Sequence, residues 1–195
     1  PGYLQKSLKH LSDPKVFGVG FSEINHENYG HIFWSDGYLQ HSPGKSTRTH
    51  ITGWLSGGSS IVSRQHFLSL GGFDPIYSPF YSEDLDLGFR AWKSGLTLLW
   101  EPDSKIYHNH ESTMSKFPKR HLDYVKERNR LLTVWRNITD PKLLSNNKSV
   151  LLRRVLTGPN YLKIILAAHR QINRFPPPLH QNILSDLQVL SKFSQ

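Results

Sequence analysis

Cysteine is absent from the 195 residues, so no disulfide framework supports the fold and nothing in the sequence favours an oxidising compartment. There is no apolar run of about 18 residues, so we expect no transmembrane helix. The sequence also has no internal repeats, and no low-complexity segment beyond the triple proline at 176–178. It starts on Pro1-Gly2 without a signal peptide or an initiator methionine, and we therefore expect it to be the inner part of a longer protein.

The composition is that of a folded chain with an uneven charge. Hydrophobic residues make up 37% and aromatic residues 12%, which is enough for a core in one domain or in a domain with an appendage. Residues 1–117 carry 10 Lys and Arg against 11 Asp and Glu, whereas residues 118–175 carry 13 against 3. We therefore predict two units, a nearly neutral one at 1–117 and a basic extension at 118–195.

Hydrophobic periodicity predicts an α/β fold for the first unit and helices for the second. Residues 22–50 are polar and predict a long surface excursion with room for a hairpin. The predicted strands are 15–21, 96–100 and 105–108, and the predicted helices are 64–70, 83–94, 119–137, 148–157, 160–173 and 182–193.

Three carboxylates gather where the helix at 83–94 is predicted to begin. Glu83, Asp84 and Asp86 follow Ser82, which is a suitable N-cap, and the helix dipole favours negative charge in this first turn. An apolar stripe further along the helix predicts that one face is buried while the acidic end lies at a loop. That arrangement suits a rigidly held general base, although carboxylates at a helix start are also common without catalysis.

An ordered set of residues surrounds this acidic stretch: Gly71-Gly72-Phe73-Asp74, Glu83-Asp84-Leu85-Asp86-Leu87, Arg90, Gly95, Pro102 and His108. Their order resembles the C-terminal half of the catalytic domain of glycosyltransferase family 2, whose members are inverting nucleotide-sugar transferases with the GT-A fold. A block on the predicted basic helix, Arg128-Asn129-Arg130-Leu131-Leu132, also resembles one that follows this domain in bacterial members.

The resemblance implies an enzyme that transfers a sugar from a nucleotide-sugar donor to a hydroxyl acceptor, with a cell-surface glycan or a lipid-linked saccharide as the expected acceptor. Asp84 matches the general base, and His108 matches a ligand of the divalent metal, Mn²⁺ or Mg²⁺, on the donor diphosphate. Contacts to the acceptor or the donor sugar are assigned to Glu83, Asp86, Gly57 and Gly58.

Plainer interpretations of two of these features stay open. A tight turn explains the small residues around Gly57-Gly58 equally well. His108 is either a metal ligand or a hydrogen-bonded structural histidine.

Two departures from the family pattern stand out. The nucleotide-binding half and its Asp-x-Asp metal motif are not in the sequence, so we expect the chain alone to be inactive. Asp84-Leu85-Asp86 has that spacing, but no apolar strand precedes it, so it is not taken for the metal motif. Ser82 stands where many relatives carry an aromatic residue.

The basic extension admits three interpretations: a solvated face, a nucleic-acid surface and an anionic membrane surface. No zinc finger, recognition-helix motif or aromatic RNA-binding motif accompanies the charge, so no nucleic acid is expected. Basic residues mixed with Leu, Ile and Val favour a peripheral membrane location, on the inner face of a membrane in the cytoplasm. The alternative to the enzyme is a non-catalytic basic module, associated with membrane or nucleic acid, that carries a degenerate transferase domain.

Overall fold

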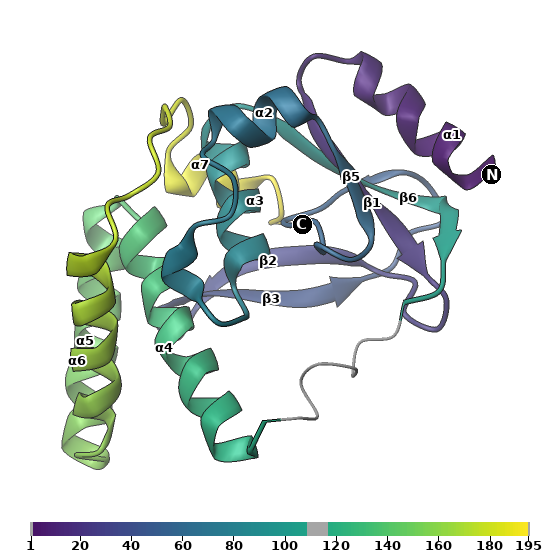
Figure 1. Ribbon diagram of the computed structural model, residues 1–195. Helices are drawn as coiled ribbons and strands as arrows, with labels where there is room; N and C mark the ends of the chain where they lie inside the picture. The colour runs from purple at the N-terminus through teal and green to yellow at the C-terminus, as the bar shows by residue number, and fades with distance from the viewer. Residues whose placement is uncertain (1, 109–116, 195) are drawn as a thin grey trace.

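The computed structural model describes residues 2–108 and 117–194 (Figure 1). Its centre is a mixed four-stranded sheet in the order β4-β6-β1-β5. The long strands β1 (Val16–Glu23) and β6 (Thr97–Ile106) run parallel, and the short strands β4 (His50–Ile51) and β5 (Ser60–Val62) pair antiparallel at the two edges. Helices pack around this sheet, which confirms the predicted α/β class.

The two strands predicted at 96–100 and 105–108 are one strand, β6. Its register against β1 shifts between Phe21 and Ser22, whose partners are Glu101 and Lys105. The residues in between were expected to form a turn, but they form an irregularity inside a continuous strand, as a bulge does. Pairing resumes after it, and β6 ends two residues before His108.

The predicted excursion at 22–50 holds a hairpin of β2 (Tyr29–Ser35) and β3 (Tyr38–Gly44), but it is not confined to the surface. Ile32 and Tyr38 are fully buried, and the carbonyl oxygen of Gly37 in the tight turn accepts a hydrogen bond of 2.8 Å from Asn147. The sequence hides this because only one side of the hairpin faces the core, so polar residues still dominate its composition.

The helices of the first part lie on the sheet. Ser63 caps α2 as predicted, with its side chain accepting from the His66 amide. The helical elements of this part are α1 (Gly2–Leu8), the 3₁₀ turn Lys9–Ser12, α2 (Arg64–Ser69), the 3₁₀ turn Pro75–Tyr77 and α3 (Glu83–Lys93).

Four further helices follow: α4 (Lys119–Asn137), α5 (Pro141–Thr157), α6 (Tyr161–Arg174) and α7 (Asp186–Ser191). The prediction for α4 is confirmed at both ends. Helix α5 begins earlier than the predicted residue 148, because Asp140 caps it and Pro141 occupies its first turn, where a missing N–H costs nothing.

One hydrophobic core runs through both predicted units. Leu131 and Leu132 of α4 are fully buried in the same cluster as Phe17 of β1, and Val189 of α7 joins it. The units at 1–117 and 118–195 are therefore not separate bodies in their packing. Within the described residues, no helix has both the length and the apolar composition needed to cross a bilayer.

Candidate functional site

The acidic stretch lies where the chain enters α3. Tyr81 and Ser82 adopt left-handed backbone conformations, with φ of 71° and 79°, so the chain turns sharply just before the first helical turn. Ser82 occupies the N-cap position, but the prediction that its side chain caps the helix is wrong, since it makes no capping hydrogen bond. The left-handed backbone turns that side chain away, and the Asp84 carboxylate instead accepts the Leu85 amide at 2.8 Å.

A pair of neighbouring residues on α4 holds this turn. The amide nitrogen of Asn129 donates to the carbonyl oxygens of Tyr77, Phe80 and Tyr81, each at 2.8 Å. Arg128 donates to the carbonyl oxygen of Ser78 at 2.6 Å and also binds the Asn129 side-chain oxygen. The loop that leads to Asp84 is thus fixed through its backbone by a helix about 50 residues away in sequence.

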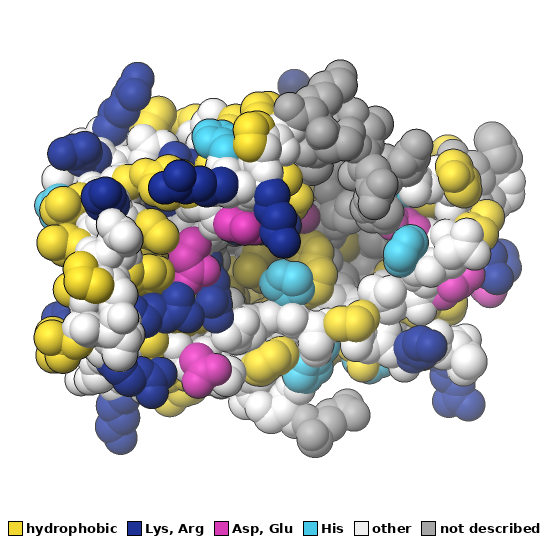
Figure 2. Space-filling view, turned by 90° about the horizontal axis from the view of Figure 1, so that it is seen from below, with side chains coloured by type: hydrophobic (Ala, Val, Ile, Leu, Met, Phe, Trp, Pro, Cys, Tyr) yellow, Lys and Arg dark blue, Asp and Glu magenta, His cyan; other side chains and the backbone are white. Residues whose placement is uncertain are grey.

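Asp84 lies where three cavities meet. It belongs to the walls of cavities of about 410, 140 and 400 Å³. Seen from below, the molecule has a hollow in which acidic, histidine and hydrophobic side chains meet, with Lys and Arg side chains gathered to its left (Figure 2). A carboxylate at such a junction is accessible to more than one bound group.

The environment of Asp84 changes its acidity. Burial, followed by the adjacent Glu83 carboxylate, raises the pKa of Asp84 to about 6. The group is therefore mostly ionised at neutral pH and yet more basic than an ordinary aspartate, which suits proton abstraction.

Glu83 supplies a second observation of the same kind. Its Oε2 atom is buried and has no hydrogen-bond partner among the described residues. It lines the cavity of about 400 Å³ together with Asp84. Buried carboxylate oxygens are normally satisfied, so an unsatisfied one beside Asp84 is unusual for a purely structural residue.

The structure brings Gly57 and Gly58 next to the other predicted residues. Gly57 shares two cavities with Asp84. A Cβ atom on Gly58 would lie 2.3 Å from Cε1 of His108, so only glycine lets the imidazole pack against this loop. Gly88 on α3 lies at another close approach: a Cβ atom there would lie 2.5 Å from the carbonyl oxygen of Gly53, so a larger residue would push the helix away from this backbone. Gly57 and Gly58 also lie in a tight turn closed by the Ser59 amide, which donates to the carbonyl oxygen of Ser56 at 3.1 Å, so the turn accounts for Gly57 and the close approach to His108 for Gly58.

Asp86 lines none of the three cavities at Asp84, so the structure corrects the prediction that it contacts a sugar. Its side chain is fully buried and forms an ion pair of 2.6 Å with Arg90. Tyr77 and Asn137 donate to its other oxygen at 2.9 and 2.8 Å. Asp86 follows Asp84 by two positions on a helix, which turns its side chain towards the core, so it anchors α3 instead of binding substrate.

The metal prediction can be compared with the residues around His108. No group of three or more His, Asp or Glu side chains that could hold a metal is present in residues 2–108 and 117–194. These residues do not form a metal site by themselves, and His108 fits at most as one ligand beside oxygen atoms of a bound diphosphate. Its role as a ligand stays a prediction.

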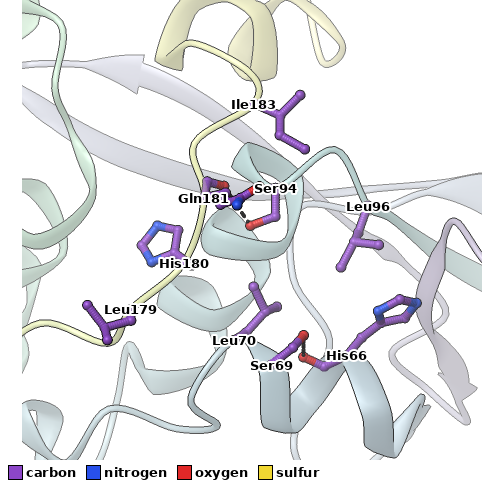
Figure 3. Close-up of a pocket in the computed structure, with 9 residues that line it drawn as sticks. All are labelled: His66, Ser69, Leu70, Ser94, Leu96, Leu179, His180, Gln181 and Ile183. Atoms are coloured by element: carbon purple, nitrogen blue, oxygen red, sulfur yellow. Dashed lines mark hydrogen bonds between the residues drawn. The ribbon is translucent and has the colours of Figure 1, made fainter.

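Another cavity lies at the far end of α3. Figure 3 shows it between α2, Ser94 and the segment 179–183, with His66 and His180 on opposite sides. Ser94 donates to the carbonyl oxygen of Gln181 at 3.0 Å there, which ties the C-terminal segment to the domain. Its walls contain two histidines and no carboxylate.

Sequence reasoning missed the residues of α4 that face the site. Lys126, Arg130 and Thr133 line the cavity of about 410 Å³ opposite Ser82 and Asp84. Their i, i+4, i+7 spacing marks one face of a helix, which could have been noticed, but the sequence does not show that this face meets α3.

Residues 1–168 match the model of a family described as Glycosyl transferase family group 2. N-acetylglucosaminyl-diphospho-decaprenol L-rhamnosyltransferase of Mycobacterium tuberculosis is 36% identical over 89 residues, which are 46% of this chain and 28% of that protein. N-acetylgalactosaminyltransferase 7 of Drosophila melanogaster is 32% identical over 59 residues, 30% of this chain and 10% of that protein. The chain thus spans less than a third of the length of these curated relatives. A crystal structure of GalNAc-T7 with UDP, GalNAc and Mn²⁺ is similar over 77% of this chain and 32% of that chain, with a TM-score of 0.40 and 13% identity.

Proposed function

This chain belongs to glycosyl transferase family group 2, and from that premise we propose that it carries the general base of an inverting glycosyltransferase. The protein transfers a sugar from a nucleotide-sugar donor to a hydroxyl group of a saccharide acceptor. The observation that carries the proposal is Asp84, which combines a pKa of about 6 with a position shared by three cavities.

The chemistry needs one base on one face of the donor sugar. A sugar hydroxyl is a poor nucleophile, and a positioned carboxylate that accepts its proton contributes roughly 10²–10⁴-fold in rate. The acceptor oxygen forms a bond to the anomeric carbon while the bond from that carbon to the diphosphate oxygen breaks. The hydroxyl proton passes to Asp84, and the nucleoside diphosphate leaves from the opposite face, which inverts the anomeric configuration.

Other residues in the site bind and orient. The Glu83 side chain, whose Oε2 has no hydrogen-bond partner among the described residues, accepts a hydrogen bond from a second acceptor hydroxyl in the cavity of about 400 Å³. The loop at Gly57-Gly58 lies beneath the donor sugar, because among the described residues a Cβ atom on Gly57 would meet only Phe73, at 3.8 Å, which leaves room for a ring beside Gly57. His108 would be one ligand of a Mn²⁺ or Mg²⁺ ion on the donor diphosphate, and the bound ion would neutralise charge on the leaving group.

For the acceptor, we propose a lipid-linked saccharide at a membrane surface. The mycobacterial relative is named for an acceptor of this kind, N-acetylglucosaminyl-diphospho-decaprenol. Helices α5 and α6 also expose apolar side chains together with basic ones: Leu152, Leu156, Leu162 and Leu166 are 45–75% exposed, and Lys148, Arg153 and Lys163 are exposed beside them. Exposed leucines flanked by cations favour binding to anionic lipid.

The membrane part can be tested by flotation with anionic vesicles. Replacing Lys148, Arg153 and Lys163 with Glu should abolish binding, whereas the same replacement of the exposed Lys9, Lys15 and Lys45 on the first part of the chain should leave most of it. Arg154 is unsuitable for this experiment, since it forms an ion pair with Glu127 and its loss would disturb the fold. Equal binding by both triple variants would contradict the membrane proposal.

The enzymatic part can be tested with the full-length natural protein. It would be incubated with a panel of nucleotide sugars and a diphospholipid-linked N-acetylglucosamine, and the product's anomeric configuration read by NMR. Transfer with inversion supports the proposal, and transfer with retention contradicts it. No transfer from any donor, together with intact vesicle binding, would favour a non-catalytic membrane-associated module.

A further inference from the structure

The cavity of about 410 Å³ beside Asp84 has a cationic wall. It is lined by Lys126 and Arg130 of α4, by Ser82 and Asp84 where α3 begins, and by His41 of the β2–β3 hairpin. Its volume is within the range of roughly 300–1,000 Å³ that small-molecule sites occupy. Two cations and one carboxylate therefore face a space large enough for a sugar and its substituent.

The two cations are held in place by aromatic rings instead of by strong ion pairs. Lys126 Nζ lies 4.6 Å from the centre of the Tyr81 ring, and the Arg130 guanidinium lies 4.0 Å from the centre of the Tyr38 ring. Lys126 has no carboxylate within 4.0 Å in the part of the chain that the structure describes. Its charge is available for a ligand.

Arg130 is only weakly neutralised. Its nearest carboxylate, Glu127, lies at 3.7 Å and is shared with Arg154, which approaches Glu127 more closely, and with the Tyr161 hydroxyl at 3.1 Å. Partial burial, and then the charge of Arg130, lower the pKa of His41, so His41 adds no charge at neutral pH. The positive potential of this wall comes from Lys126 and Arg130.

We propose that Lys126 and Arg130 bind the phosphate or diphosphate group attached to the acceptor saccharide. This inference rests on the proposed function, and the geometry of inversion decides which substrate the anion belongs to. The base and the leaving diphosphate stand on opposite faces of the donor sugar, so an anion bound on the same side as Asp84 belongs to the acceptor. A guanidinium and an ammonium group are the usual partners of phosphate oxygens.

The cationic wall also explains how one acceptor hydroxyl is selected. An anion fixed at α4 sets the distance from the phosphate to the sugar ring, and the hydroxyl that then meets Asp84 is the one that reacts. Removing a charge-assisted contact should therefore weaken acceptor binding and leave donor binding unchanged.

Steady-state kinetics with three acceptors test this: a saccharide diphosphate on a short isoprenoid, the same saccharide as its free 1-phosphate, and a phosphate-free alkyl glycoside. In Lys126→Ala and Arg130→Ala, KM for the first should rise about 10-fold or more, with KM for the donor and for the glycoside unchanged. Lys126→Arg should restore much of the loss. Lys119→Ala, an exposed position on the same helix, is the matched control.

The outcomes separate the sources of the anion. If the alanine variants lose affinity for the free 1-phosphate as well as for the isoprenoid diphosphate, the cationic wall recognises phosphate itself. If they lose affinity only for the isoprenoid diphosphate, the wall recognises the lipid-linked diphosphate. A rise in KM for the donor, or an equal rise for the glycoside, would overturn the proposal. Calorimetric titration of the chain with inorganic pyrophosphate tests the subsite without turnover. Loss of pyrophosphate binding in the double variant Lys126→Ala/Arg130→Ala would support the subsite even if no transfer were found. Unchanged binding in that variant would overturn the proposal.

Discussion

The side-chain nitrogen of Asn129 lies 2.8 Å from the carbonyl oxygen of Tyr81, three residues before Asp84. The same nitrogen reaches the carbonyl oxygens of Tyr77 and Phe80, so one buried side-chain amide on α4 fixes the backbone that leads to Asp84. The position of Asp84 therefore depends on a helix that sequence alone assigns to a separate unit.

Asn129→Ala should lower kcat by about 10–100-fold with little change in either KM, because a displacement of about 1 Å at a reacting group can cost that much. The measurement is steady-state kinetics below the melting temperature of the variant. Asn129→Asp, which keeps the shape but loses the N–H donors, should show the same defect, and Asn173→Ala on the exposed face of α6 should show none. A loss of stability with kcat intact would mean that Asn129 is only structural.

The rate should depend on pH through Asp84. Because the base acts when ionised and burial raises the pKa of Asp84 to about 6, kcat/KM should rise with pH and level off above about 6 to 7. Glu83→Gln should move the midpoint to lower pH, since the Glu83 charge is the second cause of the raised pKa. A midpoint near 4 in the unmodified protein would show that the base is not buried Asp84.

The same group should destabilise the fold at neutral pH. A folded-state pKa of about 6, against 3.8 for an ordinary exposed aspartate, means that ionisation costs the folded state up to about 3 kcal/mol, a cost absent below about pH 4. Asp84→Asn should therefore raise the free energy of unfolding at pH 7 by up to about this amount, and the gain should vanish at pH 4. Urea denaturation at both pH values measures it, and a destabilised variant at pH 7 would contradict the assignment.

Much of the fold could be predicted from local pattern, and much of the site could not. Helix α4 was predicted from its periodicity, and Asp84 was singled out by a short motif whose residues are close in sequence. A hairpin was expected within 22–50, but its burial was not, because its core-facing residues, such as Ile32 and Tyr38, are few among polar neighbours. Asn129 and Lys126 could not be given roles, since their partners lie about 45 to 50 residues away and only the packing of α4 on α3 brings them together.

The C-terminal helix is held by a buried ion pair, and this too can be tested. Lys93 Nζ lies 2.7 Å from Asp186 and 2.8 Å from the carbonyl oxygen of Asn137, with both charged side chains at most 1% exposed. Lys93→Met should lower the free energy of unfolding by about 3–5 kcal/mol, because it leaves the Asp186 carboxylate buried without its partner.

Chemical denaturation measures the change in the free energy of unfolding when the Lys93–Asp186 pair is broken. Adding Asp186→Leu to Lys93→Met should recover part of the loss, since no uncompensated charge then remains. Lys163→Met, at an exposed position of α6, is the control and should change stability by less than about 0.5 kcal/mol. Equal effects of the Lys93 and Lys163 variants would show that α7 does not depend on the pair.

The most direct measurement is the transfer rate of Asp84→Asn in the full-length natural protein, compared with Asp123→Asn on the exposed face of α4. If Asp84 is the general base, kcat should fall by about 10² or more with donor and acceptor KM nearly unchanged, while the Asp123 variant keeps its rate. Transfer by Asp84→Asn within a few-fold of the unmodified protein would show that the base lies elsewhere.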